Sequence, residues 1–189
     1  ANPRDLVSFA SSLEMLPYIK QVLAEFKSPL LTKINEDMDP LTDITSLIRN
    51  SITDDPPLAQ KDGGIIREGY NEDVDKFRRS RTDGKKWLSE LEARERERTG
   101  IKSLKIKYNR VFGYSLEVTN TFKDLVPEDY IRKQTLTNAE RYITQELKDL
   151  EDLILGAEDK LYALEFELFS SIRDQVGAEV VRIQRTAKA

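Results

Sequence analysis

A seam of apolar residues in the last third of the chain constrains its fold most strongly. Between residues 147 and 168 apolar side chains recur every three or four positions, at Leu147, Leu150, Ile154, Ala157, Leu161, Leu164 and Leu168. This heptad spacing predicts one long helix that packs along a single partner helix. We expect the helix to run from Gln145 to near Arg185, about 60 Å at the usual rise per residue, with weak points at Gly156 and Gly177.

The partner helix is predicted from Glu72 to Arg98. Its apolar positions keep helical spacing, although Arg81 and Gly84 interrupt the stripe, which consists of Tyr70, Val74, Phe77, Leu88 and Leu91. Acids and bases alternate so densely from residue 90 to 98 that most of this stretch must be solvated. Since no other long helix is predicted, we expect the two helices to form an antiparallel pair.

The segment between the helices has a period of two, which is typical of strands. Residues 104–108 and 114–118 alternate apolar and polar side chains, and Arg110–Gly113 is a plausible turn between them, so an antiparallel hairpin is predicted. Gln134 to Ile143 is predicted to be a third strand. A β region of about 45 residues on a helical stalk buries little core, which favours a contact device over a catalytic domain.

The first part of the chain is divided into short helices by prolines. Asn2-Pro3, Ser28-Pro29 and Asp39-Pro40 each combine a capping residue with a proline at the first helical position, and Pro17 restarts a helix. The predicted fold is therefore mainly α, with a helical core and a small antiparallel sheet inserted at the tip of two long antiparallel helices. The predicted segments are 1–71 for the core, 72–99 for the outgoing helix, 100–145 for the sheet and 146–189 for the returning helix.

Missing residue types exclude several functions. The chain has no cysteine and no histidine, so disulfides, thiolate or imidazole metal sites and Ser-His or Cys-His catalysis are excluded. The phosphate-binding string of Gly, four residues and Gly-Lys-Ser/Thr does not occur, and we expect neither enzymatic activity nor a cofactor. There is no apolar run of the roughly eighteen residues that a membrane span needs and no secretory signal, so a cytoplasmic protein without a membrane partner is predicted.

The charge distribution points to a polyanion. The net charge is −4, yet residues 100–145 hold eight Lys/Arg against five Asp/Glu, which leaves +3. Cations displace the counterions of a nucleic acid and amides add hydrogen bonds to phosphate oxygens. The predicted DNA-binding residues are Lys105, Lys107, Asn109, Arg110, Arg132, Lys133, Asn138 and Arg141.

Simpler interpretations remain open for these and other residues. Arg132, Lys133 and Arg141 have acids nearby in the sequence and could form surface ion pairs, whereas Lys105, Lys107 and Arg110 have none. The tip of a coiled-coil module could instead bind a protein partner, and the response to salt would distinguish the two functions. We expect Trp87 to pack between helices. The acids Glu146, Asp149, Glu151 and Asp152 favour a helix start over a metal site.

Longer strings of the sequence resemble bacterial MutS proteins, a family of DNA mismatch repair proteins. The stretch 92–101 resembles the junction between the lever and clamp domains of that family. Residues 104–118, with Asn109 and Phe112-Gly113-Tyr114, resemble the first clamp hairpin. The remaining similarity lies in residues 130–136, 138–143, 146–152, 2–6 and 63–71.

The resemblance implies a fragment with core helices, levers and clamp. In the family, two subunits close around mismatched duplex DNA, the clamps contact its backbone without sequence preference, and levers relay this contact to distant ATPase sites. ATP and Mg²⁺ belong to the full-length protein, whose Phe-x-Glu mismatch motif and ATPase are absent from this sequence. The implied partners are duplex DNA, a second MutS subunit and a MutL-type protein, at the bacterial nucleoid.

Overall fold

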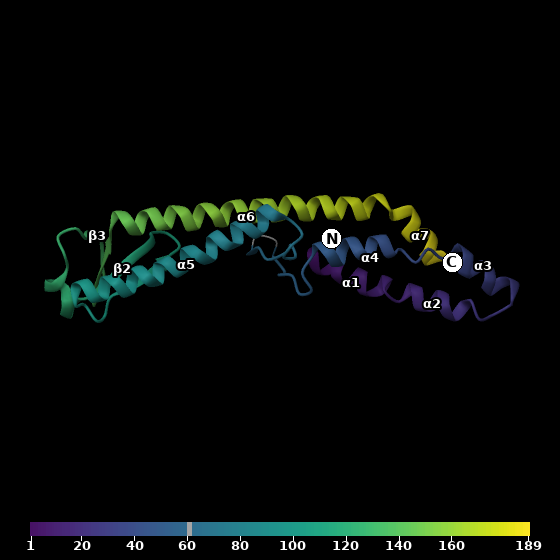
Figure 1. Ribbon diagram of the computed structural model, residues 1–189, viewed down its shortest axis with the longest axis horizontal. Helices are drawn as coiled ribbons and strands as arrows, with labels where there is room; N and C mark the ends of the chain where they lie inside the picture. Colours follow the sequence, from purple (N-terminus) through teal and green to yellow (C-terminus); the bar gives the residue numbers. More distant parts are fainter. Residues whose placement is uncertain (60–61) are drawn as a thin grey trace. The chain divides into compact units, whose positions relative to one another are not determined.

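The computed structural model describes residues 1–59 and 62–189 and shows a mainly α protein with one small antiparallel sheet, as predicted (Figure 1). The helices of the first part are α1 Pro3–Leu13, α2 Leu16–Leu23, α3 Pro29–Asp37 and α4 Thr42–Ser51. The following elements are α5 Glu72–Thr99, β1 Lys105–Asn109, β2 Gly113–Thr119, the 3-10 helix η2 Asn120–Leu125, β3 Ile131–Thr135, β4 Ala139–Ile143, α6 Gln145–Ala178 and α7 Val180–Lys188.

The described residues form two compact units. One unit comprises residues 1–75 together with 161–189, and the other comprises residues 76–160. Helix α6 contributes to both, since its first half lies in the second unit and the rest in the first. In the described part of the chain, no helix combines the length and apolar character that crossing a membrane requires.

The helix starts of the first unit follow the predicted capping signals with one exception. Asn2 and the third helical residue, Asp5, cap α1 reciprocally, α2 begins at Leu16 with Pro17 in its first turn, and α3 begins at Pro29. The start predicted at Asp39-Pro40 is wrong, because α4 begins only at Thr42. The side chain of Asp39 accepts the N–H of Leu41 instead, and Leu41 is fully buried with a left-handed backbone (φ 51°), which delays the helix.

The buried face of α6 shifts inside the first unit. The predicted seam continued through Leu164 and Leu168, but both are only partly buried. The fully or nearly fully buried residues there are Glu165, Phe169, Ile172 and Val176. The carboxylate of Glu165 accepts the backbone N–H groups of residues 64, 65 and 66 at 2.8, 3.0 and 3.0 Å. The helix therefore faces a loop backbone here, not one partner helix, and its apolar stripe rotates accordingly.

Helix α6 is continuous through Gly156, where the sequence predicted a weak point. It ends at Ala178, one residue after Gly177, and α7 follows after Glu179. Gly156 therefore does not interrupt the helix. A single glycine inside a long helix costs only about 1 kcal/mol relative to alanine, which packing on both sides of residue 156 readily offsets.

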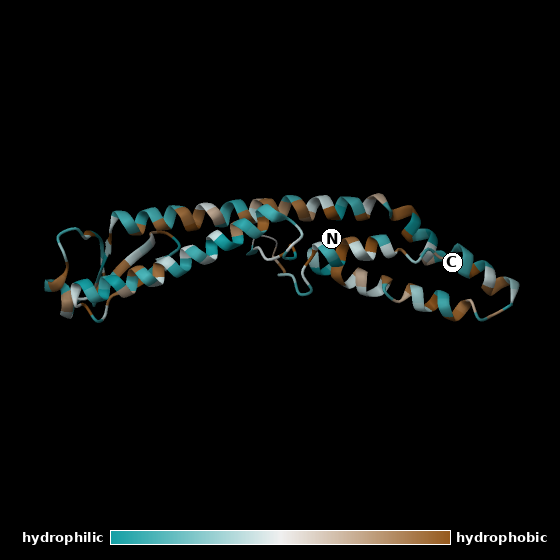
Figure 2. Cartoon of the chain, viewed as in Figure 1, coloured by the Kyte–Doolittle hydropathy of each residue, from teal (hydrophilic) through white to brown (hydrophobic). Residues whose placement is uncertain are grey.

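The second unit contains the predicted antiparallel helix pair. Ion pairs join Arg81 to Glu158 at 3.4 Å and Arg94 to Glu146 at 2.5 Å, so α5 and α6 run in opposite directions. Gly84 is buried against Ile154, and a Cβ at this position would lie 2.4 Å from Ile154 Cγ1. The glycine that interrupts the apolar stripe thus permits a close approach of the helices. Figure 2 shows recurrent hydrophobic bands on α6 and a mostly hydrophilic α5.

The sheet has the strand order β1-β2-β4-β3, with all neighbours antiparallel. The hairpin predicted at residues 104–118 is confirmed as β1 and β2. The single third strand predicted from Gln134 to Ile143 is wrong, because Thr137 and Asn138 lie in a turn between β3 and β4. The N–H of Leu136 bonds to the carbonyl of Ala139 at 2.8 Å and closes this turn.

One face of the sheet packs on the helix pair. Leu116, Val118 and Tyr142 are buried in a cluster with Leu88 and Leu91 of α5. Residues Ile101, Leu104, Tyr130, Leu147 and Ile154 complete this core. The opposite face of the sheet is therefore the one that is left for contact with another molecule.

Candidate nucleic-acid interface

The face of the sheet opposite the core carries several of the predicted cations. Lys105 lies opposite Glu117, and Glu117 lies opposite Arg141, so the three side chains share one face. Lys107 lies on the same face because side chains alternate along a strand. Leu116 and Val118, the neighbours of Glu117, point into the core. We call Lys105, Lys107, Glu117 and Arg141 the polar face.

Glu117 organises this polar face. Its carboxylate accepts hydrogen bonds from Lys107 Nζ at 2.6 Å and from Arg141 Nε at 3.1 Å. The hydrogen bond from Lys107 and, next, the one from Arg141 hold the pKa of Glu117 below its usual range despite partial burial. The polar face has a net charge of +2, because it holds three cations, Lys105, Lys107 and Arg141, and one carboxylate, Glu117.

The neighbours of Lys107 and Arg141 differ from those expected in the sequence. Lys107 has no acid close by along the chain, yet Glu117 is its partner across the hairpin. Arg141 has acids nearby in the sequence, but its ion pair is with Glu117, and it also bonds to Gln134, whose Oε1 lies 2.9 Å from Arg141 Nη1. Strand pairing decides these contacts, since it brings together residues that are distant in sequence.

Lys105 and Arg110 are both exposed, and no ion pair to either occurs in the described part of the chain. They lie at opposite ends of the first strand, because Lys105 begins β1 and Arg110 follows its last residue. Lys105 belongs to the polar face, whereas Arg110 lies in the β1–β2 turn.

The two predicted asparagines lie in turns. Asn109 Oδ1 accepts the N–H groups of Val111 and Phe112 at 2.8 and 3.1 Å, so its carbonyl oxygen holds the β1–β2 turn. Asn138 is exposed in the β3–β4 turn, at the other end of the sheet. The backbone N–H of Asn120, which the sequence did not single out, donates to the carbonyl of Asn138 at 3.0 Å.

Arg132 and Lys133 leave the polar face because of a bulge in β3. Arg132 lies opposite Tyr142 and so shares the face that packs on the helices, with Glu140 3.8 Å away. The register shifts between Arg132 and Gln134. Lys133 Nζ donates to the carbonyl of Phe112 at 2.7 Å and lies beside the β1–β2 turn. The eight predicted residues therefore fall into separate groups.

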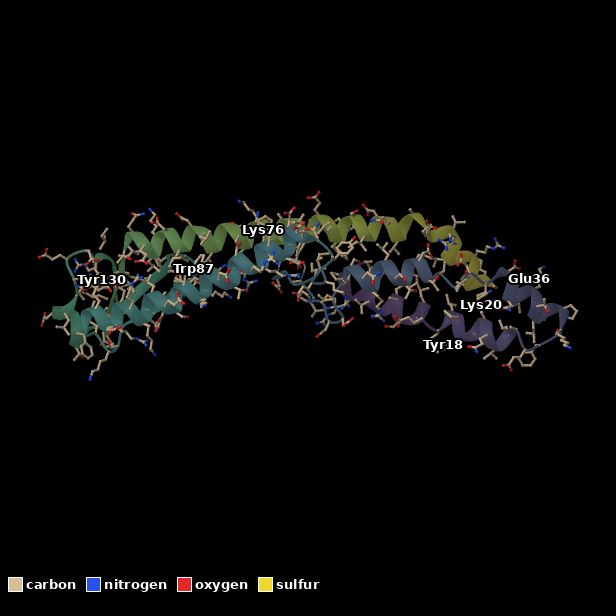
Figure 3. All side chains as sticks on the ribbon, viewed as in Figure 1. Tyr18, Lys20, Glu36, Lys76, Trp87 and Tyr130 are labelled. Atoms are coloured by element: carbon tan, nitrogen blue, oxygen red, sulfur yellow. The ribbon has the colours of Figure 1, made fainter. Side chains whose placement is uncertain are left out.

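A second network joins the end of α5 to the sheet. Tyr130 donates its hydroxyl proton to Glu95 at 2.7 Å, and Arg98 bonds to both Glu95 and Asp129. Glu95 is buried, and burial together with this hydrogen bond raises the pKa of Tyr130. Sequence reasoning missed this network, although the alternating charges of residues 90–98 contain its members. Figure 3 labels Tyr130 at this end of the unit.

Two other predictions concern the helix pair. Trp87 is 42% exposed on α5, and it lines a surface pocket together with Leu150 and Leu153 of α6 (Figure 3). Among the described residues, no group of three or more acids could hold a metal ion. The acids at the start of α6 have other partners: Glu146 bonds to Arg94, Asp149 to Gln145, and Glu151 to the backbone of Tyr114.

The second unit is thus a small antiparallel sheet with a cationic outer face, carried on a pair of antiparallel helices. Comparison with known proteins gives the family. The model of MutS family domain IV matches residues 69–160. DNA mismatch repair protein MutS of Lachnoclostridium phytofermentans is 62% identical over 189 residues, which is 100% of this chain and 20% of that protein.

Other MutS proteins match over the same range. The protein of Acetivibrio thermocellus is 51% identical over 189 residues, 100% of this chain and 22% of that protein. The protein of Caldanaerobacter subterraneus is 56% identical over 186 residues, 98% of this chain and 21% of that protein. The chain belongs to the MutS family of DNA mismatch repair proteins. It spans about one fifth of the length of the curated relatives that it matches.

Proposed function

We propose that this chain binds the backbone of duplex DNA through the polar face of its sheet. The observation that carries the proposal is the convergence of Lys105, Lys107 and Arg141 around a single carboxylate on the face opposite the core. Cations on a rigid sheet suit phosphate oxygens, and their binding releases condensed counterions. The names of the relatives, DNA mismatch repair proteins, support the same function.

The proposed contact has no sequence preference. Helices α5 and α6 form the stalk of the sheet, and no recognition helix lies beside the polar face among the described elements. Phosphate contacts position a protein on DNA without reading its bases. We expect the chain to bind duplexes of unrelated sequence with similar affinity.

The longer family members supply the context of this contact. We propose that the paired helices α5 and α6 relay DNA binding to the ATPase of a full-length protein that uses ATP and Mg²⁺. A second MutS subunit would hold a second clamp on the same duplex, and a MutL-type protein would act downstream. We propose no catalytic step for the chain itself. We place its action at the bacterial nucleoid.

The test is duplex DNA binding by residues 1–189 across a salt series. The variant Lys105→Ala/Lys107→Ala/Arg141→Ala removes the cations of the polar face. Its matched control is Lys85→Ala/Lys86→Ala/Lys148→Ala, which removes the same charge from exposed positions on the helices. Each lost phosphate contact should lower the logarithmic salt slope by about 0.9, and only the first variant should show this. Equal losses in both variants would contradict the assignment of the polar face.

A second candidate function is the binding of a protein partner by the tip. The observation that favours it is the exposure of Val111 and Phe112 in the β1–β2 turn, 81% and 45% respectively. An apolar contact responds weakly to salt, in contrast to phosphate binding. If the polar face binds DNA, Val111→Ser/Phe112→Ser should leave DNA binding unchanged. If the turn binds a protein partner, the same variant should no longer bind that partner.

A further inference from the structure

Two carboxylates of the long helices bond to the backbone of the β1–β2 hairpin. Glu92 of α5 accepts the N–H of Ile106 in β1 at 2.7 Å. Glu151 of α6 accepts the N–H of Tyr114 in β2. Each helix therefore holds one strand of the hairpin, and the hairpin carries Lys105, Lys107 and the cation of the turn, Arg110.

The contact with α5 occupies the free edge of the sheet. Strand β1 is an edge strand, so one side of its backbone has no strand partner. Arg96 Nε donates to the carbonyl of Leu104 at 2.7 Å, while Glu92 accepts the N–H of Ile106. Arg96 and Glu92 also form an ion pair at 2.5 Å. These two side chains thus take the place of a neighbouring strand: Arg96 donates to residue 104, just before β1, and Glu92 accepts from residue 106.

The contact with α6 depends on Gly113. Pairing of β2 with β4 begins at Leu116, so the N–H of Tyr114 lies beyond the last paired residue of β4 and is taken by Glu151. A Cβ at Gly113 would lie 2.2 Å from Glu151 Oε2, and the backbone there has φ 73°. Only glycine meets both conditions without strain. The backbone conformation and the missing side chain at Gly113 therefore allow the carboxylate of Glu151 to approach the hairpin closely.

We propose that Glu92 and Glu151 are positioning residues that fix the orientation of the cationic hairpin on the helix pair. Besides the bond from Arg96 to Leu104, the hairpin packs on the helices through apolar residues such as Leu116 and Val118, and apolar contacts are not directional. Hydrogen bonds to a carboxylate are short and directional, so they set the angle of β1 and β2 against α5 and α6. A force on the hairpin from bound phosphates reaches α5 through Glu92 and α6 through Glu151. This last consequence rests on the proposed DNA contact.

The direct test measures the position of the hairpin. Since the chain has no cysteine, Val111→Cys and Lys148→Cys can carry the only two spin labels, both at exposed positions. We expect one narrow distance distribution in the parent protein and a shifted or broadened one in Glu151→Ala and in Glu92→Ala. Glu151→Gln should restore the narrow distribution, because the amide oxygen still accepts the N–H of Tyr114. Circular dichroism and melting curves select variants that keep the fold.

Matched controls separate position from charge. Asp152→Ala and Glu97→Ala remove the same charge from exposed neighbours on the same helices, and the distance should stay unchanged in both. Unchanged distances in Glu92→Ala and Glu151→Ala would overturn the proposal, and so would equal changes in the controls.

DNA binding provides a second readout with opposite signs. Loss of an acid by itself weakens repulsion of phosphates, so Asp152→Ala should bind duplex DNA as well as the parent chain or better. Glu151→Ala should bind it several-fold more weakly, because its cations are misplaced. Equal affinities of the two variants would overturn the positioning role in a chain that binds DNA. If the parent chain binds no DNA, the proposed function fails, and the distances alone decide the role of Glu92 and Glu151.

Discussion

Glu165 is a single buried carboxylate that fixes the backbone around it. Its side chain is 0% exposed, and a buried carboxylate is costly unless its oxygens are satisfied. Three consecutive N–H groups at residues 64–66 supply the hydrogen bonds. The neighbouring Gly63 has φ 68°, and a Cβ there would lie 2.3 Å from the ring of Tyr162, so the loop needs glycine at this point. The loop and α6 are thereby fixed to each other.

The substitution Glu165→Ala should destabilise the first unit strongly. It removes the carboxylate that accepts the N–H groups of residues 64, 65 and 66, and we expect a loss of about 3 kcal/mol or more in the free energy of unfolding. Urea unfolding followed by circular dichroism measures the loss. The control is Glu167→Ala, an exposed acid of the same helix, for which a change within about 0.5 kcal/mol is expected. Similar effects of both substitutions would contradict the assigned role of the buried carboxylate.

The acid dependence of stability tests Glu117. Its pKa is lowered in the folded protein, chiefly by Lys107 and then by Arg141, relative to an ordinary value of 4.5. The resulting stabilisation is fully present above the unfolded value and is lost as the pH falls through the lower folded value. We expect Glu117→Gln to lose less stability than the parent chain when the pH is lowered through this range. Parallel stability curves for the two proteins would be evidence against the ionic contact.

At the scale of elements, two glycines of the helix pair should respond oppositely to alanine. In an exposed helix Gly→Ala stabilises by roughly 0.5–1 kcal/mol. Gly156→Ala should gain this amount, because a Cβ at residue 156 would meet no atom within 4 Å. Gly84→Ala should instead destabilise, because Ile154 occupies the space that the methyl group needs. Thermal unfolding of both variants measures this, with a higher melting temperature expected for Gly156→Ala and a lower one for Gly84→Ala.

A double mutant checks the cause of the loss at Gly84. Ile154→Ala removes the Cγ1 atom that would collide with the new methyl group. The penalty of Gly84→Ala should therefore be smaller in the Ile154→Ala background than in the parent chain, which appears as a coupling energy in a mutant cycle. Additive losses would show that the helices do not meet at these residues.

The elements differ in how well the sequence predicts them. The capped start of α1, the proline start of α3, the two long helices and the β1–β2 hairpin are encoded by local periodicity and by residues at the helix starts. The start of α4 and the split between β3 and β4 are not, because both depend on what is buried around them. Leu41 accepts a left-handed backbone inside the core, and the bulge near Lys133 adapts β3 to β4.

At the scale of the whole molecule, α6 is the element that contributes long stretches to both units. Its residues up to Lys160 belong to the unit with the sheet, and those from Leu161 belong to the unit with the N-terminal helices. A helix that is continuous through this point can transmit displacement as a rigid body. The proposed relay therefore depends on an unbroken helix at Leu161.

Proline at residue 161 tests this dependence. Leu161→Pro removes a helical N–H and clashes with the preceding turn, at a cost of about 3 kcal/mol or more. We expect a full-length protein with this change to keep DNA binding and to lose the stimulation of ATP hydrolysis by DNA. Leu161→Ala is the control, because it removes the buried side chain without breaking the helix. Unchanged stimulation in the proline variant would contradict the relay through α6.

The candidate site shows what strand pairing adds to the sequence. All eight predicted residues lie in the unit with the sheet, as expected from the local charge of residues 100–145. Their grouping could not be predicted, since Glu117 meets Lys107 and Arg141 only across β1, β2 and β4. The bulge in β3 also turns Arg132 to the other face, and a shift of one residue reverses the side of every side chain.

Local sequence patterns encode the order of the elements, the long helices and the hairpin, because periodicity and capping act over a few neighbouring residues. Long-range packing sets which face of α6 is buried after Leu161, the close approach of the helices at Gly84, and which cations share the polar face. These contacts join residues that are tens of positions apart. Their energies depend on packing and on strand register, which no local pattern contains.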